Sequence, residues 1–227
     1  MTGPFVLRRL KKDVLRELPG KEERIVYSAA SGRQQKLYTA SALKLKEALA
    51  GGAWSGNGKL EVLSQLMRLR QICCDPALCF EDYTGESAKL ETCVSLIASA
   101  SAAGHKILLF SQFASMLERI RERLLQEGIS SHLLVGATPK EERSRMVQAF
   151  ASDEVPVFLI SLKAGGTGLN LTAADIVIHY DPWWNVAAQN QATDRAYRIG
   201  QEKPVTVYKL ILKDTIEENL LKLQNAK

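Results

Sequence analysis

The sequence predicts an α/β protein with a doubly wound, mainly parallel sheet, flanking helices and a helical arm ahead of the sheet. From residue 88 onward, short apolar runs alternate with helical patterns, as expected when crossover helices join parallel strands. Before residue 85 the patterns are helical and strand signals are few. With 46% hydrophobic and 24% charged residues among 227, the chain can bury a sizeable core. We therefore expect an arm at 1–84, a sheet domain at 85–213 and a C-terminal helix at 214–227.

The arm carries two helical patterns around one loop. Residues 34–50 hold spaced leucines among good helix formers, and residues 60–74 repeat apolar side chains at helical spacing up to Pro76. The glycine-rich stretch at 51–58 indicates a loop between them. This pattern is typical of a helical arm that connects to another part of a protein.

In the sheet domain, strands and helices alternate with short loops. Strands are expected at 106–110, 132–135, 157–161, 175–180 and 205–211, and helices at 88–103, 114–127, 139–150 and 186–198. The sequences TPKE at 138–141 and DTIE at 214–217 predict capping boxes that begin two helices. Ligands of such sheets gather at the carboxyl ends of the strands.

Composition limits the classes of partner and site. The net charge of +5 is compatible with a nucleic-acid partner without requiring one. The four cysteines and three histidines lack zinc-ligand spacing, so no metal site is predicted. No apolar run is long enough for a membrane span and no signal peptide is evident. We therefore expect a cytoplasmic protein without a membrane partner, associated with nucleoid or nuclear DNA if it binds nucleic acid.

The segment QATDRAYRIGQ at 191–201 carries the strongest functional signal. If it forms a helix, four polar side chains at i, i+3, i+4 and i+7 share one face: Gln191, Asp194, Arg195 and Arg198. Arginine presents a planar, permanently charged fork that suits phosphate oxygens. The alternative is a solvated helix face with an i, i+4 ion pair. The segment alone leaves both interpretations open.

A glycine-rich loop follows the expected strand at 157–161. Its glycines, Gly166 and Gly168 among them, allow a tight turn that brings backbone amides close to a ligand. A dinucleotide fingerprint is the obvious competitor, but the third glycine is missing, and a strand rather than a long helix follows. A plain glycine turn remains the simplest alternative.

Polar side chains stand where other strands end. Ser111 and Gln112 follow one strand, and Thr138 follows the next. Hydroxyls, amides and helix N-termini at such an edge can hold phosphates without reading bases, although each residue singly is explained by turn chemistry.

Two adjacent tryptophans, Trp183 and Trp184, follow the expected strand at 175–180. Neighbouring side chains on a strand or helix do not point the same way. We therefore expect one indole to pack inside while the other stays available for a partner or a domain contact.

The motifs together resemble one known family. In order, they are KILLFSQF at 106–113, LLVGATPKEER at 133–143, VFLISLKAGGTGLNLTAADIVIHYDPWWN at 157–185 and NQATDRAYRIGQ at 190–201. This set closely resembles the C-terminal RecA-like lobe of Swi/Snf-type ATP-dependent DNA translocases, in helicase superfamily two. FVLRRLKKDVLRELP at 5–19 and LRQICCDP at 69–76 resemble the interlobe segment of that family, and DTIEENLL at 214–221 resembles its closing brace helix.

The chain departs from the family pattern at a few positions. Asp75 stands where histidine is most common, and Val186 stands where proline is usual. Val135 and Ala137 replace residues that are usually more polar. These departures weaken the assignments around 135–138 and Trp184 and leave the segment at 191–201 untouched.

The resemblance implies roles for individual residues. Arg195 and Arg198 would be arginine fingers that reach the γ-phosphate of ATP across the interlobe cleft, with Gln191 orienting that edge and Asp194 fixing a guanidinium. Gly166, Gly168 and Asn170 would line the cleft. The side chains near the DNA phosphates would be Ser111, Gln112, Thr138, Ser161, Lys163 and Trp184.

The resemblance also shows which parts the sequence lacks. No G-x-x-x-x-G-K-[ST] loop occurs, and no Asp-Glu metal-binding pair follows a buried strand. We therefore expect a fragment of a longer protein, in which a second, N-terminal lobe completes the site for ATP and Mg²⁺ and double-stranded DNA is the partner. A strand-separating helicase of the same superfamily and a non-catalytic protein-docking module are the alternatives.

Overall fold

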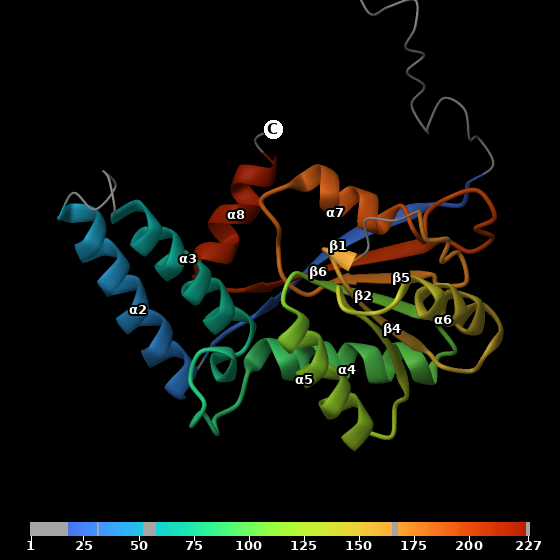
Figure 1. The fold of residues 1–227 in the computed structure, drawn as a ribbon, viewed down its shortest axis with the longest axis horizontal. Helices are drawn as coiled ribbons and strands as arrows, with labels where there is room; N and C mark the ends of the chain where they lie inside the picture. The colour runs from blue at the N-terminus through green and yellow to red at the C-terminus, as the bar shows by residue number, and fades with distance from the viewer. Residues whose placement is uncertain (1–17, 31, 52–57, 165–167, 226–227) are drawn as a thin grey trace, which may run out of the picture.

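The computed structural model describes residues 18–30, 32–51, 58–164 and 168–225 (Figure 1). Its centre is a six-stranded, all-parallel sheet with the strand order β1-β6-β5-β2-β4-β3. The strands are β1 Lys21–Ser28, β2 Ile107–Ser111, β3 Ser131–Leu134, β4 Val157–Ser161, β5 Ile176–His179 and β6 Val205–Leu212. The predicted α/β class with a doubly wound parallel sheet is thereby confirmed.

Helices cover both faces of the sheet. They are α2 Gly32–Ala50, α3 Gly58–Cys74, the short 3₁₀ helix η2 Pro76–Leu78, α4 Ala88–Ala102, α5 Ala114–Gln126, α6 Lys140–Ser152, α7 Val186–Thr193 and α8 Ile216–Asn225. Ile107 and Leu109 of β2 pack with α4 and α5, whereas Leu108 and Phe110 belong to the core with α6 and α7. This alternation follows from the two-residue period of a strand, which directs successive side chains to opposite faces. Figure 1 shows α4 and α5 below the sheet and α7 above it.

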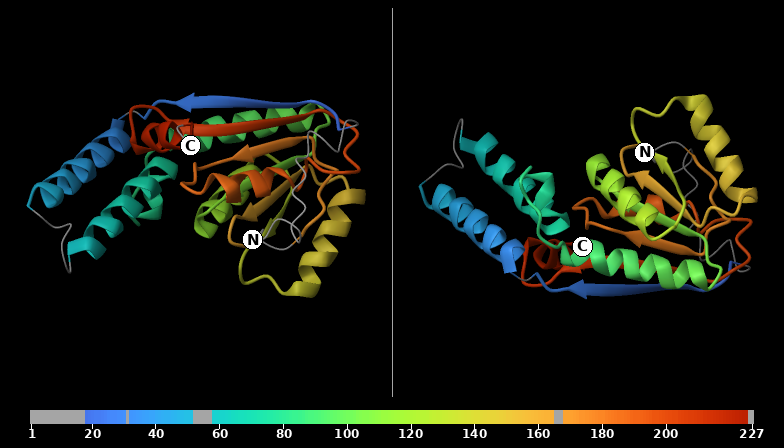
Figure 2. Two further views of the ribbon diagram at one scale, coloured as in Figure 1. Left: turned by 90° about the horizontal axis from the view of Figure 1, so that it is seen from above. Right: turned by 90° about the horizontal axis from the view of Figure 1, so that it is seen from below.

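The expected helical arm is present as the pair α2 and α3. The two helices pack on each other around Leu45 and Leu69, and this core continues to Leu212 at the end of β6. Figure 2 shows the pair projecting beyond one end of the sheet. Since all strands run parallel and β6 ends at this core, the arm lies at the carboxyl edge of the sheet.

The helical patterns before residue 85 did not indicate β1. This strand pairs with β6 along its whole length, from Lys21 beside Val205 to Ser28 beside Leu212. It is one of the two edge strands of the sheet, and most of its side chains are exposed. Charged residues suit such an edge because they discourage pairing with another chain. They also hide the apolar alternation by which a strand is predicted.

Both predicted capping boxes are wrong in detail. α6 begins at Lys140, and the Thr138 hydroxyl accepts a hydrogen bond from Val135 N at 3.1 Å instead of capping the helix. At α8 the capping side chain is that of Thr215, one residue later than the predicted Asp214, and its hydroxyl accepts from Glu217 N at 3.3 Å. Asp214 has a positive φ of 59°. In both cases the turn before the helix differs from the one that a capping box requires. At α6 the Thr138 hydroxyl bonds within that turn, and at α8 Thr215 rather than Asp214 bonds to the first turn of the helix.

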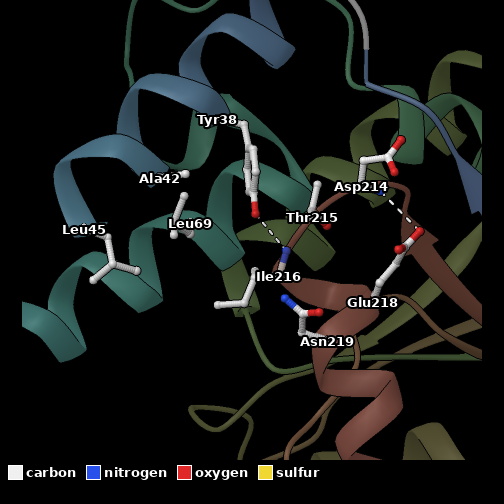
Figure 3. A pocket seen from close by; sticks show the side chains of 9 residues that line it. All are labelled: Tyr38, Ala42, Leu45, Leu69, Asp214, Thr215, Ile216, Glu218 and Asn219. Carbon is white, nitrogen blue, oxygen red and sulfur yellow. Dashed lines mark hydrogen bonds between the residues drawn. The ribbon is translucent and has the colours of Figure 1, made fainter. Parts of the chain in front are cut away.

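A pocket of about 470 Å³ lies where the arm meets α8 (Figure 3). Within it, the Tyr38 hydroxyl accepts a hydrogen bond at 2.7 Å from the amide of Ile216, the first residue of α8. Burial raises the pKa of Tyr38 to about 12. The hydrogen bond ties the arm to the beginning of the C-terminal helix.

Among the described residues, no helix has the length and apolar character required to cross a bilayer.

Candidate functional site

The candidate site lies at the carboxyl edge of the central strands. Ser111 at the end of β2 stands in register with Ser161 at the end of β4, and Leu162 N donates to Ser111 O at 2.9 Å. On the other side of β2, Tyr180 N donates to Phe110 O at 2.9 Å, which brings the residues after β5 to the same edge. Loops after three neighbouring strands therefore meet here, as expected for a ligand site of this fold.

Asp181 organises the middle of this edge, a role that the sequence analysis missed. Its carboxylate accepts from the Ser111 hydroxyl at 2.5 Å, from Gln112 N at 3.3 Å and from the Gln112 side-chain amide. Arg70 of α3 lies 4.0 Å away and donates to Pro182 O at 2.9 Å. Burial raises the pKa of Asp181, while the Ser111 hydrogen bond and the charges of Lys89 and Arg70 oppose that rise. Its position directly after a buried strand was the available signal.

The residues predicted near DNA phosphates differ in accessibility. Ser111 and Ser161 are buried, and the Ser111 hydroxyl is engaged by Asp181. Gln112 and Thr138 are half-buried, and both hold hydrogen bonds within the protein. Lys163 is exposed. A phosphate could reach Lys163 directly, whereas the serines would first have to be uncovered.

The two tryptophans point in different directions, as expected. Trp183 is half-buried, packs against the core under α6 and α7, and donates from its backbone N to Gln189 Oε1 at 3.3 Å. Trp184 is 63% exposed, and its ring stands at 88° to that of Trp183. Trp184 is therefore the indole that a partner can reach.

The arginine segment is only partly helical. α7 ends at Thr193 and Asp194 caps it, so Arg195 and Arg198 do not share a helix face with Gln191. The prediction of one continuous helix over 186–198 is therefore wrong. The backbone turns because Arg195 O accepts from Leu171 N at 3.0 Å, which ties the segment to the residues after the glycine loop.

Arg195 is buried and incompletely paired. It is 6% exposed, and its Nε has no hydrogen-bond partner among the described residues. Burial lowers the pKa of Arg195, the like charge of Arg198 acts in the same direction, and Asp194 opposes both. Arg198 itself is exposed. The two arginines thus differ in burial, with Arg195 inside the protein and Arg198 at its surface.

A pocket of about 230 Å³ opens beside Arg195. Its lining is mainly apolar, with Lys163, Gln191 and Arg195 as the long polar side chains among Phe110, Leu162, Trp183, Ala188 and Ala192. An apolar hollow with a few polar tips is typical of a small ligand site, and the charges of this one favour an anion.

The glycine loop is described only in part. Gly166 lies outside the described residues, whereas Gly168 and Asn170 are exposed. Gly168 has a φ of +27°, which suits glycine. Through Leu171 this loop is bonded to Arg195, so the glycine loop and the arginine segment are adjacent.

The described residues contain no group of three or more His, Cys, Asp and Glu side chains that could hold a metal ion. The four cysteines are all unpaired thiols.

Comparison with known families matches both parts of the chain. Residues 88–200 match the helicase conserved C-terminal domain, and residues 1–78 match the SNF2-related domain. The second match includes α2 and α3, which pack against β6 and α8.

Curated proteins that match the chain are much longer than it. An uncharacterized ATP-dependent helicase of Mycoplasma genitalium is 41% identical over 235 residues, which cover 100% of this chain and 22% of the relative. The human SWI/SNF-related matrix-associated actin-dependent regulator of chromatin subfamily A member 1 is 36% identical over 238 residues, covering 99% of this chain and 23% of the relative. The chain thus spans less than a quarter of the length of either protein.

Solved structures match most of the chain. The Sulfolobus solfataricus SWI2/SNF2 ATPase C-terminal domain has a TM-score of 0.76 and 32% identity, covering 90% of this chain and 85% of that chain. The ATPase core from the same organism, in complex with double-stranded DNA, has a TM-score of 0.79 and 35% identity, covering 99% of this chain and 48% of that chain. The chain therefore belongs to the Swi/Snf family of ATP-dependent helicases and corresponds to the C-terminal RecA-like lobe of their ATPase core.

Proposed function

We propose that this chain is the C-terminal half of an ATP-driven motor that translocates on double-stranded DNA. In the two-lobed parent, the other lobe would hold ATP, and this lobe would supply Arg195 and Arg198 as fingers toward the γ-phosphate. Such arginines stabilise the charge that spreads over a transferring phosphoryl group. Gln191 would orient that edge, and Asp194 would fix a guanidinium.

One observation carries this proposal: Arg195 is nine-tenths buried, and its Nε lacks an acceptor among the described residues. A buried donor on a permanently charged group is costly unless a ligand supplies an acceptor. A phosphate supplies both the acceptor oxygen and the negative charge. Lys163 and Gln191 line the same pocket, so an anion held there would meet additional donors. These features fit a nucleotide phosphate.

The described residues do not fit Mg²⁺. They contain no cluster of metal-ligating side chains, and the sequence has no phosphate-cradling loop with its metal-binding hydroxyl. The metal ion that accompanies ATP would therefore be held by the other lobe, and no residue of this chain is assigned to it.

For the DNA partner, Lys163 and Trp184 are the accessible candidates at the carboxyl edge. Contacts of this kind neutralise backbone phosphates and are nearly blind to sequence. The SWI2/SNF2 core from Sulfolobus solfataricus, which is 35% identical, was solved in complex with double-stranded DNA. A backbone-tracking role supports location at the nucleoid or in the nucleus.

Arg198→Ala in the two-lobed protein tests the finger role. DNA-stimulated ATP hydrolysis should fall about 10³-fold or more, because the transferring phosphoryl group loses a stabilising charge. The affinity for DNA should change little. The matched control is Arg121→Ala, because Arg121 is exposed on α5, away from the site. A loss of DNA affinity as steep as the loss of turnover would contradict the finger role.

The 227 residues alone should hydrolyse no ATP, because the sequence lacks a phosphate-binding loop. Addition of the N-terminal lobe should restore hydrolysis. DNA-stimulated hydrolysis by this chain alone would contradict its assignment as half of a motor.

A strand-separating helicase is the second candidate, because the Mycoplasma genitalium relative is described as an ATP-dependent helicase. Both activities would use the same fingers, so hydrolysis does not separate them. Displacement of a third strand from a triplex, without separation of the duplex strands, is expected for a translocase. Efficient separation of the duplex by the two-lobed protein would favour the helicase.

A further inference from the structure

The side chain of Gln201 lies at the end of the arginine segment and is almost fully buried. Its Nε2 lies 3.1 Å from Thr172 O, 2.8 Å from Ala174 O and 3.1 Å from Ala196 O. Its Oε1 accepts from Lys203 N at 2.9 Å. Both the nitrogen and the oxygen of the amide are therefore hydrogen-bonded.

These neighbours fix the orientation of the amide. Three carbonyl oxygens surround one atom, so that atom must be the nitrogen, whose two N–H groups are shared among them. A rotation that exchanged the amide nitrogen and oxygen would place Oε1 against the three carbonyl oxygens and would leave Lys203 N without an acceptor. Gln201 is therefore held in a single arrangement within the buried site.

The bonds of Gln201 connect two stretches of chain. Ala196 precedes Arg198 on the turn, whereas Thr172 and Ala174 precede β5. The turn is also closed locally, because Arg198 O accepts from Gln201 N at 3.0 Å. Gly200 has a φ of +95°, which permits the chain to reverse at this point. Arg198 thus projects from a short loop whose far end is anchored by Gln201.

We propose that Gln201 is the positioning residue for the arginine segment: its amide holds the loop of Arg198 against the residues before β5. This role deepens the proposed function and rests on it. An exposed arginine on a turn has many rotamers, and only a fixed backbone aims it reproducibly. A misplacement of about 1 Å in such a group can reduce turnover about 100-fold.

Gln201→Met in the two-lobed protein tests this role, because methionine keeps the length of the side chain and removes the amide. Turnover should fall by about 10- to 100-fold while the KM for ATP changes little, since a finger acts mainly in the transition state. Amide hydrogen exchange should become faster at 196–203 and at 171–174. Wild-type turnover in this variant would overturn the proposal.

Gln34→Met is the matched control. Gln34 is also buried, donates to Ile72 O at 3.0 Å and accepts from Ala88 N at 3.2 Å, but it ties the arm to α4. Both variants lose the hydrogen bonds of one buried amide, so both should lower the melting temperature. Only Gln201→Met should lower turnover at a temperature where both proteins are folded. An equal loss of turnover in the two variants would reduce Gln201 to a structural role.

A double variant separates this proposal from the proposed function. If Gln201 acts through Arg198, Gln201→Met should lower the turnover of Arg198→Ala by less than about twofold. A further large loss would show that Gln201 does not act through Arg198 and would overturn its role in positioning that arginine. Full turnover in Arg198→Ala would contradict the finger itself. An inactive Arg198→Ala beside a fully active Gln201→Met would contradict the positioning role alone.

Discussion

Lys89 and Glu217 form an ion pair that is sealed from solvent and joins α4 to α8. The Lys89 Nζ lies 2.5 and 2.7 Å from the two carboxylate oxygens, and the side chains are 0% and 1% exposed. Lys89 also donates to Tyr180 O at 3.2 Å, and Glu217 accepts from Leu212 N at 2.8 Å. The pair thus connects the C-terminal helix to the residue before Asp181, at the candidate site.

Glu217→Gln should strongly destabilise the protein. Burial lowers the pKa of Lys89, but the charge of Glu217 outweighs this and raises it, so Lys89 stays protonated. Without Glu217 the ammonium is buried unpaired, and the free energy of unfolding should fall by about 3–5 kcal/mol. Urea denaturation measures the change, and Glu22→Gln, in an exposed pair with Arg24, is the control with little effect expected.

The double variant Lys89→Met, Glu217→Leu is the internal check on this explanation. Apolar residues of similar volume remove both charges and should restore most of the lost stability. Equal instability of the single and double variants would show that packing, rather than the unpaired charge, accounts for the loss.

His179 should make stability depend on pH. Burial lowers its pKa from 6.5 to about 3, and the charge of Lys209 acts in the same direction. Between these values the unfolded chain binds the proton and the folded protein does not, so the free energy of unfolding falls as pH is lowered. From about pH 7.5 to about pH 5.5, His179 should account for a loss of about 1.4 kcal/mol.

His179→Gln should remove this part of the pH dependence, which urea denaturation at several pH values measures. In the wild-type protein, His179 Nε2 lies 2.8 Å from the hydroxyl of Thr193, the last residue of α7. A wild-type slope in the variant would show that other groups titrate in this window.

The strands that the sequence predicted have buried or half-buried side chains along their length. β2 and β4 are apolar up to a final serine and every residue is buried, and such apolar runs are visible in the sequence. β1 is an exposed edge strand of mostly polar residues, held by its backbone pairing with β6, and no apolar pattern marks it. Sequence patterns therefore predicted the central strands and the half-buried edge strand β3, but not the exposed edge strand β1.

The end of α7 was not predictable for a different reason. Residues 194–198 are compatible with a helix, and nothing local stops them. The helix ends where Leu171 N and the Gln201 amide bond to carbonyls of the turn. These bonds join residues far apart in sequence or depend on the folded loop, so tertiary structure overrides local preference.

Asp75 shows how a departure from the family pattern is accommodated. It accepts from Ala77 N at 2.9 Å, which caps η2, and from Arg119 Nε of α5 at 2.9 Å. The sequence identified the position as unusual, but the partner on α5 could be recognised only from the structure.

Lys163→Ala should weaken binding of the two-lobed protein to duplex DNA equally for all sequences. One lost phosphate contact should reduce the magnitude of the slope of log affinity against log salt by about one. Lys36→Ala, at an exposed position on the arm, is the matched control, with an unchanged slope expected. Fluorescence anisotropy at several salt concentrations measures the slope. An unchanged slope in Lys163→Ala would exclude this lysine from the DNA contact.

Alanine variants of the two tryptophans should change different quantities, DNA affinity for Trp184 and stability for Trp183. Trp184→Ala should weaken duplex binding by about tenfold, because an exposed indole at an interface often contributes more than 1 kcal/mol. Its free energy of unfolding should change little, since the side chain is 63% exposed. Trp183→Ala should instead cost about 3 kcal/mol of stability, because it opens a space against the core.

Fluorescence anisotropy at fixed salt measures the DNA affinity of these variants, and urea denaturation measures their stability. If Trp184→Ala loses stability and keeps its DNA affinity, Trp184 belongs to the packing of this lobe or to a domain contact, and the DNA contact must lie elsewhere on the edge.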